Sequence, residues 1–285
     1  MTSLSNQTAA PRSGPSRARR LLSRTGAAWF IAALCGQALF AVYILLAYGL
    51  SAARGDWAFW TANLVNGILD GDPFGNALVV LHLLLAFVIT ASGPLQLIPS
   101  LRRHMPGFHR WNGRIYLLVA VIISLGGIAM SVTRPAFGGP VNAFLQSFNA
   151  VTILFCAALA WRFALARNLA AHRRWATRLF LAASGVWFLR IMMISWAIPT
   201  GGAGLGNELD GPAGLFFMLG QTVIPLAVYQ LYLMAEGSRS GLAQSAMAAA
   251  LALLTLIMSA GIVGVTFAMW LPVIEAQAAA GTGPR

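Results

Sequence analysis

Long apolar segments alternate with short polar segments along most of the chain. Each apolar segment is close to the ~20 residues that a helix needs to cross a bilayer. We expect membrane spans at residues 27–50, 77–98, 113–132, 141–165, 175–198, 213–235 and 247–271. The pattern therefore predicts an all-α integral membrane protein with a seven-helix transmembrane domain over residues 27–272. Residues 1–26 are expected to form a disordered basic cytoplasmic tail, and residues 273–285 an external tail.

The composition supports this class. Charged residues make up 9% of the 285 residues and hydrophobic residues 58%, whereas roughly 25% of a soluble domain is charged. The net charge of +12 could suggest a nucleic-acid partner, but the cations occur in short clusters between apolar segments. That distribution is typical of loops retained in the cytoplasm. We therefore expect the lipid bilayer as the main partner, and no nucleic acid.

The charges also predict an orientation. All 19 basic residues are arginines, and most of them lie on or next to one side if the amino terminus is cytoplasmic. Every acidic residue except Glu236 then falls on the other side. Positively charged loops stay in the cytoplasm, so we predict a cytoplasmic amino terminus and an external carboxyl terminus.

Polar side chains inside the spans are the first candidates for function, because each one costs free energy in the bilayer. The second span carries His82, and the spacing to Gly93 and Gln96 places all three on one face of a helix. This face would look into the bundle. Two interpretations stay open: His82 binds a ligand or carries a proton, or it forms a hydrogen bond that holds two helices together.

Arg190 lies well inside the external end of the fifth span, and no span contains an acidic residue to pair with it. It could extend outward to the acidic loops, be held by carbonyl groups and water, or bind an acidic ligand group such as a haem propionate or a lipid phosphate. His82 and Gln221 fall in the same half of the bilayer. We therefore predict a ligand-binding site from His82, Gln96, Arg190 and Gln221.

Two similar basic and aromatic clusters open the third and fifth spans. We interpret them as an interfacial collar on the cytoplasmic side, formed by Arg110, Arg114, Arg173, Trp175 and Arg178. Each cluster also contains a histidine, and two histidines from separate helices can ligate one haem iron. The candidate ligands of a haem b are His82, His109 and His172, although His109 and His172 lie at the ends of their spans, where interfacial caps and lipid-headgroup contacts are the ordinary role. The chain shows no Cys-rich metal motif, nucleophilic triad or phosphate loop, so we predict no metal site and assign no catalytic residue.

The run Gly93-Pro94-Leu95-Gln96, the pairs His109-Arg110 and His172-Arg173, and Arg190 resemble a known family. This is domain of unknown function 2306, and the resemblance covers roughly residues 82–190. It implies a multi-pass protein of the bacterial inner (cytoplasmic) membrane. It implies no particular activity.

Three functions remain open from the sequence. The first is a membrane redox protein that binds haem b or a quinone. The second is a transporter or binder of an anionic small molecule or lipid. The third is a non-catalytic accessory subunit, for which a membrane-complex partner or a second copy of the chain would be needed. Whether the protein is an enzyme is not decided by these residues.

Overall fold

Helices are the regular elements of the part of the chain that the structure describes. This computed structural model describes residues 16–64, 67–134 and 137–280. In chain order the elements are α1 (Arg17–Tyr43), the π-helical turn η1 (Ile44–Gly49), α2 (Leu50–Arg54), α3 (Trp57–Asn63), α4 (Pro73–Leu97), α5 (Pro99–His104), α6 (Pro106–Thr133), α7 (Gly139–Leu165), α8 (Leu169–Ala183), α9 (Gly185–Thr200), α10 (Pro212–Gly237), α11 (Gly241–Val265), the π-helical turn η2 (Thr266–Trp270) and α12 (Leu271–Ala280).

Within the described residues, six helices are long and apolar enough to cross a membrane. They are α1 with η1 and α2, α4, α6, α7, α10, and α11 with η2 and α12. Helices α8 and α9 also meet the criterion as a pair, but they are bent by 55°. The all-α, multi-pass architecture is therefore confirmed, and seven spans result if the bent pair counts as one.

The fifth predicted span, residues 175–198, is not the continuous helix that its apolar sequence suggested. The helix stops at Ala183, and α9 begins at Gly185. Ser184 and Gly185 are adjacent at the break, and sharp bends in helices are common at such Gly and Ser pairs. A hydropathy pattern carries no trace of this bend because apolar residues continue on both sides.

Two predicted tails are partly helical. Helix α1 begins at Arg17, where the Ser16 hydroxyl oxygen caps it by accepting a hydrogen bond from the Arg19 N–H at 3.2 Å. Residues 17–26 are thus helical, and residues 1–15 of the predicted tail lie outside the described residues. At the other end α12 reaches Ala280, so only residues 281–285 of that predicted tail lie outside the description. Polar residues alone do not stop a helix when a good cap precedes them.

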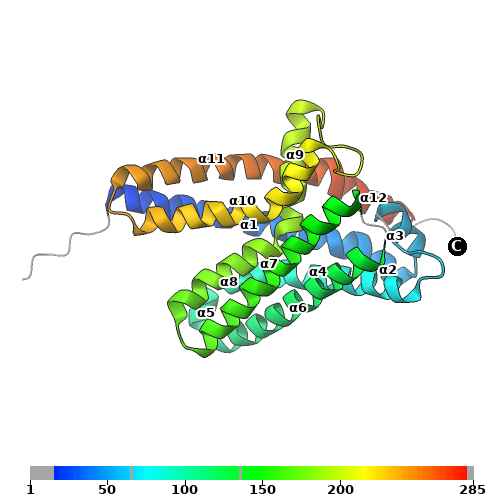
Figure 1. The fold of residues 1–285 in the computed structure, drawn as a ribbon, viewed down its shortest axis with the longest axis horizontal. Helices are drawn as coiled ribbons and strands as arrows, with labels where there is room; N and C mark the ends of the chain where they lie inside the picture. Colours follow the sequence, from blue (N-terminus) through cyan, green and yellow to red (C-terminus); the bar gives the residue numbers. More distant parts are fainter. Residues whose placement is uncertain (1–15, 65–66, 135–136, 281–285) are drawn as a thin grey trace, which may run out of the picture.

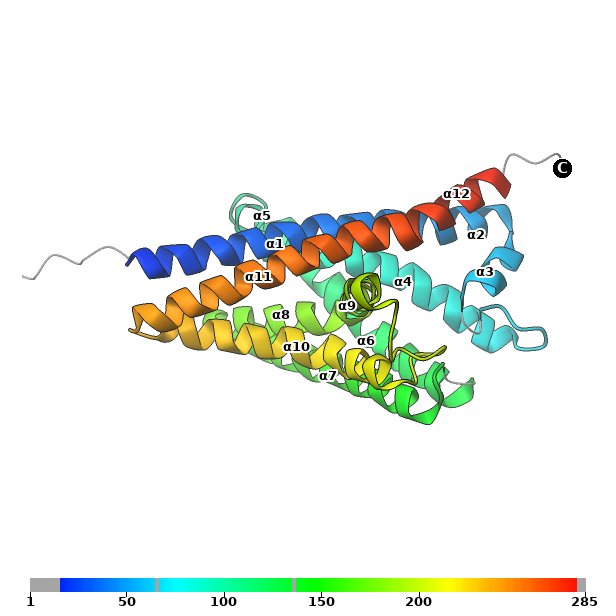
Figure 2. The same cartoon turned by 90° about the horizontal axis from the view of Figure 1, so that it is seen from above.

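The long helices form two layers that diverge toward one end of the molecule (Figure 1). Helices α1, α10 and α11 form one layer, and α4, α6, α7 and α8 form the other. Helix α9 leans out of both and packs on α10 and α11. Figure 2 shows the close pairing of α1 with α11 along most of their length.

The charges separate along the bundle. The end where α1, α6 and α8 begin and α10 ends carries most of the arginines, and we call it the arginine-rich end. The opposite end, with α2, α3 and the start of α4, carries Asp56, Asp72 and Glu208, and we call it the acidic end. This separation follows the predicted pattern. The assignment of the arginine-rich end to the cytoplasm stays a prediction.

Aromatic packing joins α1 to α11 near the acidic end. The Trp270 ring stacks on Phe40 and Tyr43, with centroid distances of 5.3 and 5.8 Å. Both helices pass through a π-helical turn in this region. The extra residue in a π-helical turn rotates the side chains that follow it. In η1 this region contains Tyr48, whose ring packs edge-on against Trp60.

Candidate functional site

A polar cavity of about 310 Å³ lies between α4, α6, α7 and the start of α9. Its polar lining side chains are His82, Ser124, Ser131, Arg134, Gln146 and Asn149. No carboxylate is among the lining residues. A cavity with these groups can donate and accept several hydrogen bonds, and its one permanent charge is positive.

Three atoms of this lining are buried and have no hydrogen-bond partner among the described residues. They are Nδ1 of His82, Oγ of Ser124 and Oδ1 of Asn149. Ser124 is 3% exposed and Asn149 is 6% exposed. Most buried polar atoms in proteins are paired, and an unpaired one costs roughly 1–3 kcal/mol. Three such atoms in one cavity indicate a place where a polar ligand would be stabilised.

The cavity reaches the break between α8 and α9. Ala183 and Val186, which flank the break, belong to its wall. At the break the Ser184 hydroxyl donates to the carbonyl oxygen of Phe180 at 2.7 Å and accepts from Nε2 of Gln37, also at 2.7 Å. Irregular backbone within a membrane is tolerated where it lines a cavity or has polar partners. The break at Ser184 borders the polar cavity and also has hydrogen-bond partners for the Ser184 hydroxyl.

Gly185 allows Asn149 to approach the break. A β-carbon at residue 185 would lie 2.5 Å from Nδ2 of Asn149 and 3.4 Å from Oε1 of Gln221. A side chain at this position would therefore collide with the Asn149 amide and contact the Gln221 amide. The absence of a side chain at this position brings polar groups from α7 and α10 against the start of α9.

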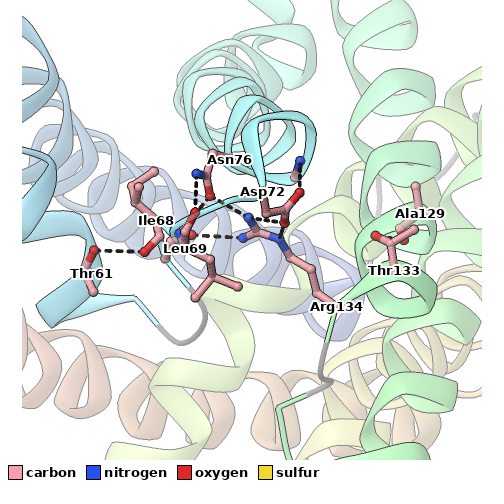
Figure 3. A network of polar contacts seen from close by, with 10 residues as sticks. Thr61, Ile68, Leu69, Asp72, Asn76, Ala129, Thr133 and Arg134 are labelled. Atoms are coloured by element: carbon pink, nitrogen blue, oxygen red, sulfur yellow. Dashed lines mark hydrogen bonds and ion pairs between the residues drawn. The ribbon is translucent and has the colours of Figure 1, made fainter.

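Arg134, which lines the cavity, is the centre of an ion-paired network at the acidic end (Figure 3). Arg134 donates from Nε to the Asp72 carboxylate at 2.9 Å, from Nη2 to Oδ1 of Asn76 at 2.6 Å, and from Nη1 to the Gly67 carbonyl at 2.9 Å. The Asp72 carboxylate also accepts from the Gly75 N–H at 2.8 Å. This backbone hydrogen bond and the Arg134 guanidinium hold the pKa of Asp72 below its usual value. The network fixes the end of α6 against the start of α4.

The predicted ligand-binding residues separate in the structure. His82 lines the polar cavity, and its imidazole faces Gly127 of α6. Gln221 is fully buried behind Gly185, where its Nε2 donates to the Met218 carbonyl at 3.0 Å. Its Oε1 has no partner among the described residues.

Arg190 does not line the cavity. Its Nη1 donates to the carbonyl oxygen of Val186 at 3.2 Å, and its Cζ lies 5.3 Å from the centre of the Phe40 ring. The described residues show no ion pair between Arg190 and an acidic side chain. Of the predicted solutions, the structure shows the carbonyl partner, and the aromatic face of Phe40 is a contact that was not predicted. One turn of α9 separates Arg190 from the cavity wall at Val186.

Gln96 lies at the arginine-rich end of α4, away from the cavity. Its Oε1 would be 3.2 Å from a β-carbon on Gly113, and its Nε2 has no partner in the described structure. One face of α4 therefore carries both His82 and Gln96, as predicted, because both contact α6. The length of α4 keeps them in separate environments.

The two collar clusters lie at the arginine-rich end, at the starts of α6 and α8. Arg114 stacks over Trp111 at 5.1 Å and Arg178 over Trp175 at 4.7 Å, while Arg110 and Arg173 are exposed. His172 bonds through Nδ1 to the Ala160 carbonyl at 2.9 Å, and His109 lies near enough to interact with it electrostatically. Neither histidine lines the polar cavity.

Ser124, Arg134, Gln146 and Asn149 were not among the predicted site residues. Ser124, Gln146 and Asn149 are polar residues within predicted spans, which is the signal that could have identified them. Arg134 follows the third predicted span, where a charge is ordinary. Only the folded chain shows that it meets Asp72.

The comparison with protein families gives a match for the middle of the chain. Residues 79–208 match the model of DUF2306, described as a predicted membrane protein. We call residues 79–208 the DUF2306 segment, after the family model that they match. No curated protein and no solved structure matches the chain. The DUF2306 segment contains every residue that lines the polar cavity, from Val79 to Val186. It includes the predicted resemblance over residues 82–190, which is confirmed.

Proposed function

We propose that the DUF2306 segment forms an intramembrane binding site for a small polar solute, and that the protein transports this solute. The observation that carries the proposal is the polar cavity beside a broken helix, with unpartnered atoms on His82, Ser124 and Asn149. Substrate sites of membrane transporters are commonly formed at discontinuous helices. The break at Ser184 supplies that feature here.

The lining favours a solute with a negatively charged group. No carboxylate lines the cavity to repel an anion, and the one charged lining group, Arg134, is already ion-paired with Asp72 outside the lining. The cavity volume of about 310 Å³ lies at the small end of ligand sites, which span roughly 300–1,000 Å³. A small carboxylate fits these conditions, with Asn149 and Ser124 bonding its polar substituents.

The proposal includes an orientation. If the arginine-rich end faces the cytoplasm, as positively charged loops do, then the acidic end and the Arg134 network face the outside. The cavity would then bind solute in the external half of the bacterial inner membrane. Release toward the cytoplasm would require α8 and α9 to move relative to one another at Ser184.

Haem binding is the second candidate, and one observation favours it. His109 and His172 from separate helices lie near enough at the arginine-rich end to interact electrostatically, and Nδ1 of His109 is buried without a partner among the described residues. An absorbance spectrum of the purified protein, oxidised and then reduced, tests it. A Soret band that disappears in His109→Ala or His172→Ala would support haem, and a colourless protein after expression with a haem precursor would exclude that role.

Asn149→Leu tests solute binding. We expect a small carboxylate to stabilise the wild-type protein against heat, by about 2.7 kcal/mol at a hundredfold excess over Kd, and to leave Asn149→Leu unaffected. The variant itself should be at least as stable as wild type, because Oδ1 of Asn149 has no partner to lose. Thr152→Val is the matched control, since this residue lies on the same helix and bonds only to the Phe148 carbonyl.

The measurement is thermal unfolding with a panel of small carboxylates, followed by uptake into proteoliposomes. Stabilisation and uptake that survive in Thr152→Val and vanish in Asn149→Leu would support the proposal. If no carboxylate distinguishes wild type from Asn149→Leu and no uptake occurs, the cavity is not a solute site.

A further inference from the structure

A second cavity, of about 430 Å³, lies between the two layers of helices. Helices α1, α10 and α11 form one side, and α8 and α9 form the other. Its wall is almost entirely apolar, with Trp29, Phe30, Phe180, Val228 and Met258 among the residues that shape it. In contrast to the polar cavity, it offers a ligand little except an apolar surface.

This apolar cavity reaches both the bilayer surface and the arginine-rich end. Ile257 lines it and is 47% exposed, and its neighbours Leu253 and Leu256 lie on the outer face of α11 at 59% and 69% exposure, so the cavity borders the lipid-facing side of α11. Its few polar lining groups include Ser23, Thr177 and Tyr232, which lie toward the arginine-rich end. A molecule that enters from the bilayer would therefore have its polar end near the arginines.

Arg178 is placed beside this polar end. Its Cζ lies 4.7 Å from the Trp175 ring and 5.6 Å from the ring of Tyr229, which lines the apolar cavity. Its Nη2 donates to Oε1 of Gln230 at 2.8 Å. The described residues show no ion pair for Arg178. Two aromatic faces and one neutral amide hold the guanidinium, so its charge is available to an anion.

We propose that the apolar cavity holds an acyl chain of an anionic phospholipid whose phosphate contacts Arg178. An apolar cavity that borders the lipid-facing side of α11 matches a lipid chain, and a guanidinium pairs well with a phosphate. Basic residues at the cytoplasmic membrane surface attract anionic lipids, and the arginines at this end add to that attraction. The site is independent of the polar cavity, because it lies on the other face of the broken helix.

Native mass spectrometry of the full-length protein tests the site. The protein is reconstituted in nanodiscs of phosphatidylcholine alone, or of phosphatidylcholine mixed with phosphatidylglycerol, and the retained lipid is identified. We expect wild type to retain one phosphatidylglycerol in preference to phosphatidylcholine. Arg178→Gln should lower this preference about tenfold, the size expected for a lost charge-assisted hydrogen bond. Val228→Trp, which fills the cavity, should lower retention of both lipids.

Arg173→Gln is the matched control, because Arg173 is exposed on the same helix and bonds to the backbone of Leu169. Thermal unfolding in detergent without lipid shows that each variant is folded. An equal loss of preference in Arg173→Gln would mean that surface charge alone selects the lipid, and would overturn the proposal. Full retention of both lipids by Val228→Trp would also overturn the proposal. Equal retention of the two lipids by wild type would do the same.

Discussion

The two cavities lie on opposite faces of the same broken helix and differ in chemistry. Ala183 and Val186 face the polar cavity, while Phe180 and Phe188 face the apolar cavity. The polar cavity is formed entirely within the DUF2306 segment. The apolar cavity also needs α1, α10 and α11, which lie outside that segment. The family-matched part of the chain thus carries the polar site, and the flanking helices add the apolar one.

The two cavities also differ in what stabilises the helices around them. Around the apolar cavity, buried aromatic and aliphatic side chains pack α9 and α11 against α1. Around the polar cavity, three buried atoms have no partner in the described part of the chain, and the Arg134 network holds α4 to α6. A region with unpaired polar atoms is less stable than its packing alone would make it, which is common at binding sites. The predictions below test the two regions in turn.

The largest effect is expected where α9 crosses α11. A β-carbon on Gly261 would lie 2.7 Å from Cγ2 and 3.0 Å from the carbonyl oxygen of Ile191, which lines the apolar cavity. Gly261→Leu would force the helices apart, and we expect it to lower the free energy of unfolding by about 3 kcal/mol or more. A β-carbon on Gly126 would meet nothing within 4 Å.

Gly126→Leu is therefore the control for the change in side-chain volume, and should leave stability nearly unchanged. Thermal and denaturant unfolding in detergent would measure both variants. Equal unfolding midpoints for the two would show that the α9–α11 contact contributes little, and that the layers are held together elsewhere.

The sequence predicts this architecture well because each span is a run of apolar residues, and such a run is a local property. The break at Ser184 was not predicted, since apolar residues continue from α8 into α9. The bend decides which side chains share a cavity. Arg190 follows the break, and its position beside Phe40 depends on the direction in which α9 leaves it.

The candidate site was predicted in part for the same reason. His82 is a rare polar residue in a span, and that rarity marked it from the sequence. Ser124 and Asn149 are small polar residues of a kind that often forms hydrogen bonds between helices, so their unpaired state appears only in three dimensions. Arg134 and Asp72 are 62 residues apart in sequence, and no local pattern connects them.

Arg134→Met should have the next largest effect, and it tests the polar region. The Arg134 side chain is 5% exposed and its guanidinium bonds to Asp72, Asn76 and the Gly67 carbonyl. Hydrogen bonds to charged groups contribute roughly 1.5–3 kcal/mol, and we expect a loss of about 2–3 kcal/mol, because Asp72 remains partly hydrated. Arg103→Met, at an exposed position of the other end, is the control. An unfolding midpoint for Arg134→Met like that of Arg103→Met would show that the network does not stabilise α4 against α6.

The smallest effect is a dependence on pH at the same network. The pKa of Asp72 is lowered in the folded protein by the Gly75 N–H and by Arg134. A carboxyl group of this kind contributes stability above its ordinary pKa of roughly 3.9, and that contribution is lost as the pH falls from there through the lowered value. Its side chain is 38% exposed, so solvent screening keeps the effect modest.

Asp56 and Glu208 at the acidic end also accept backbone hydrogen bonds, so Asp72→Asn is needed as the reference. We expect wild type to unfold at a higher temperature than Asp72→Asn at neutral pH, and the difference to shrink below about pH 4. A difference that persists at low pH would mean that the Asp72 charge does not support the network, and that the neutral hydrogen bonds to Asn76 and Gly67 hold Arg134 in place.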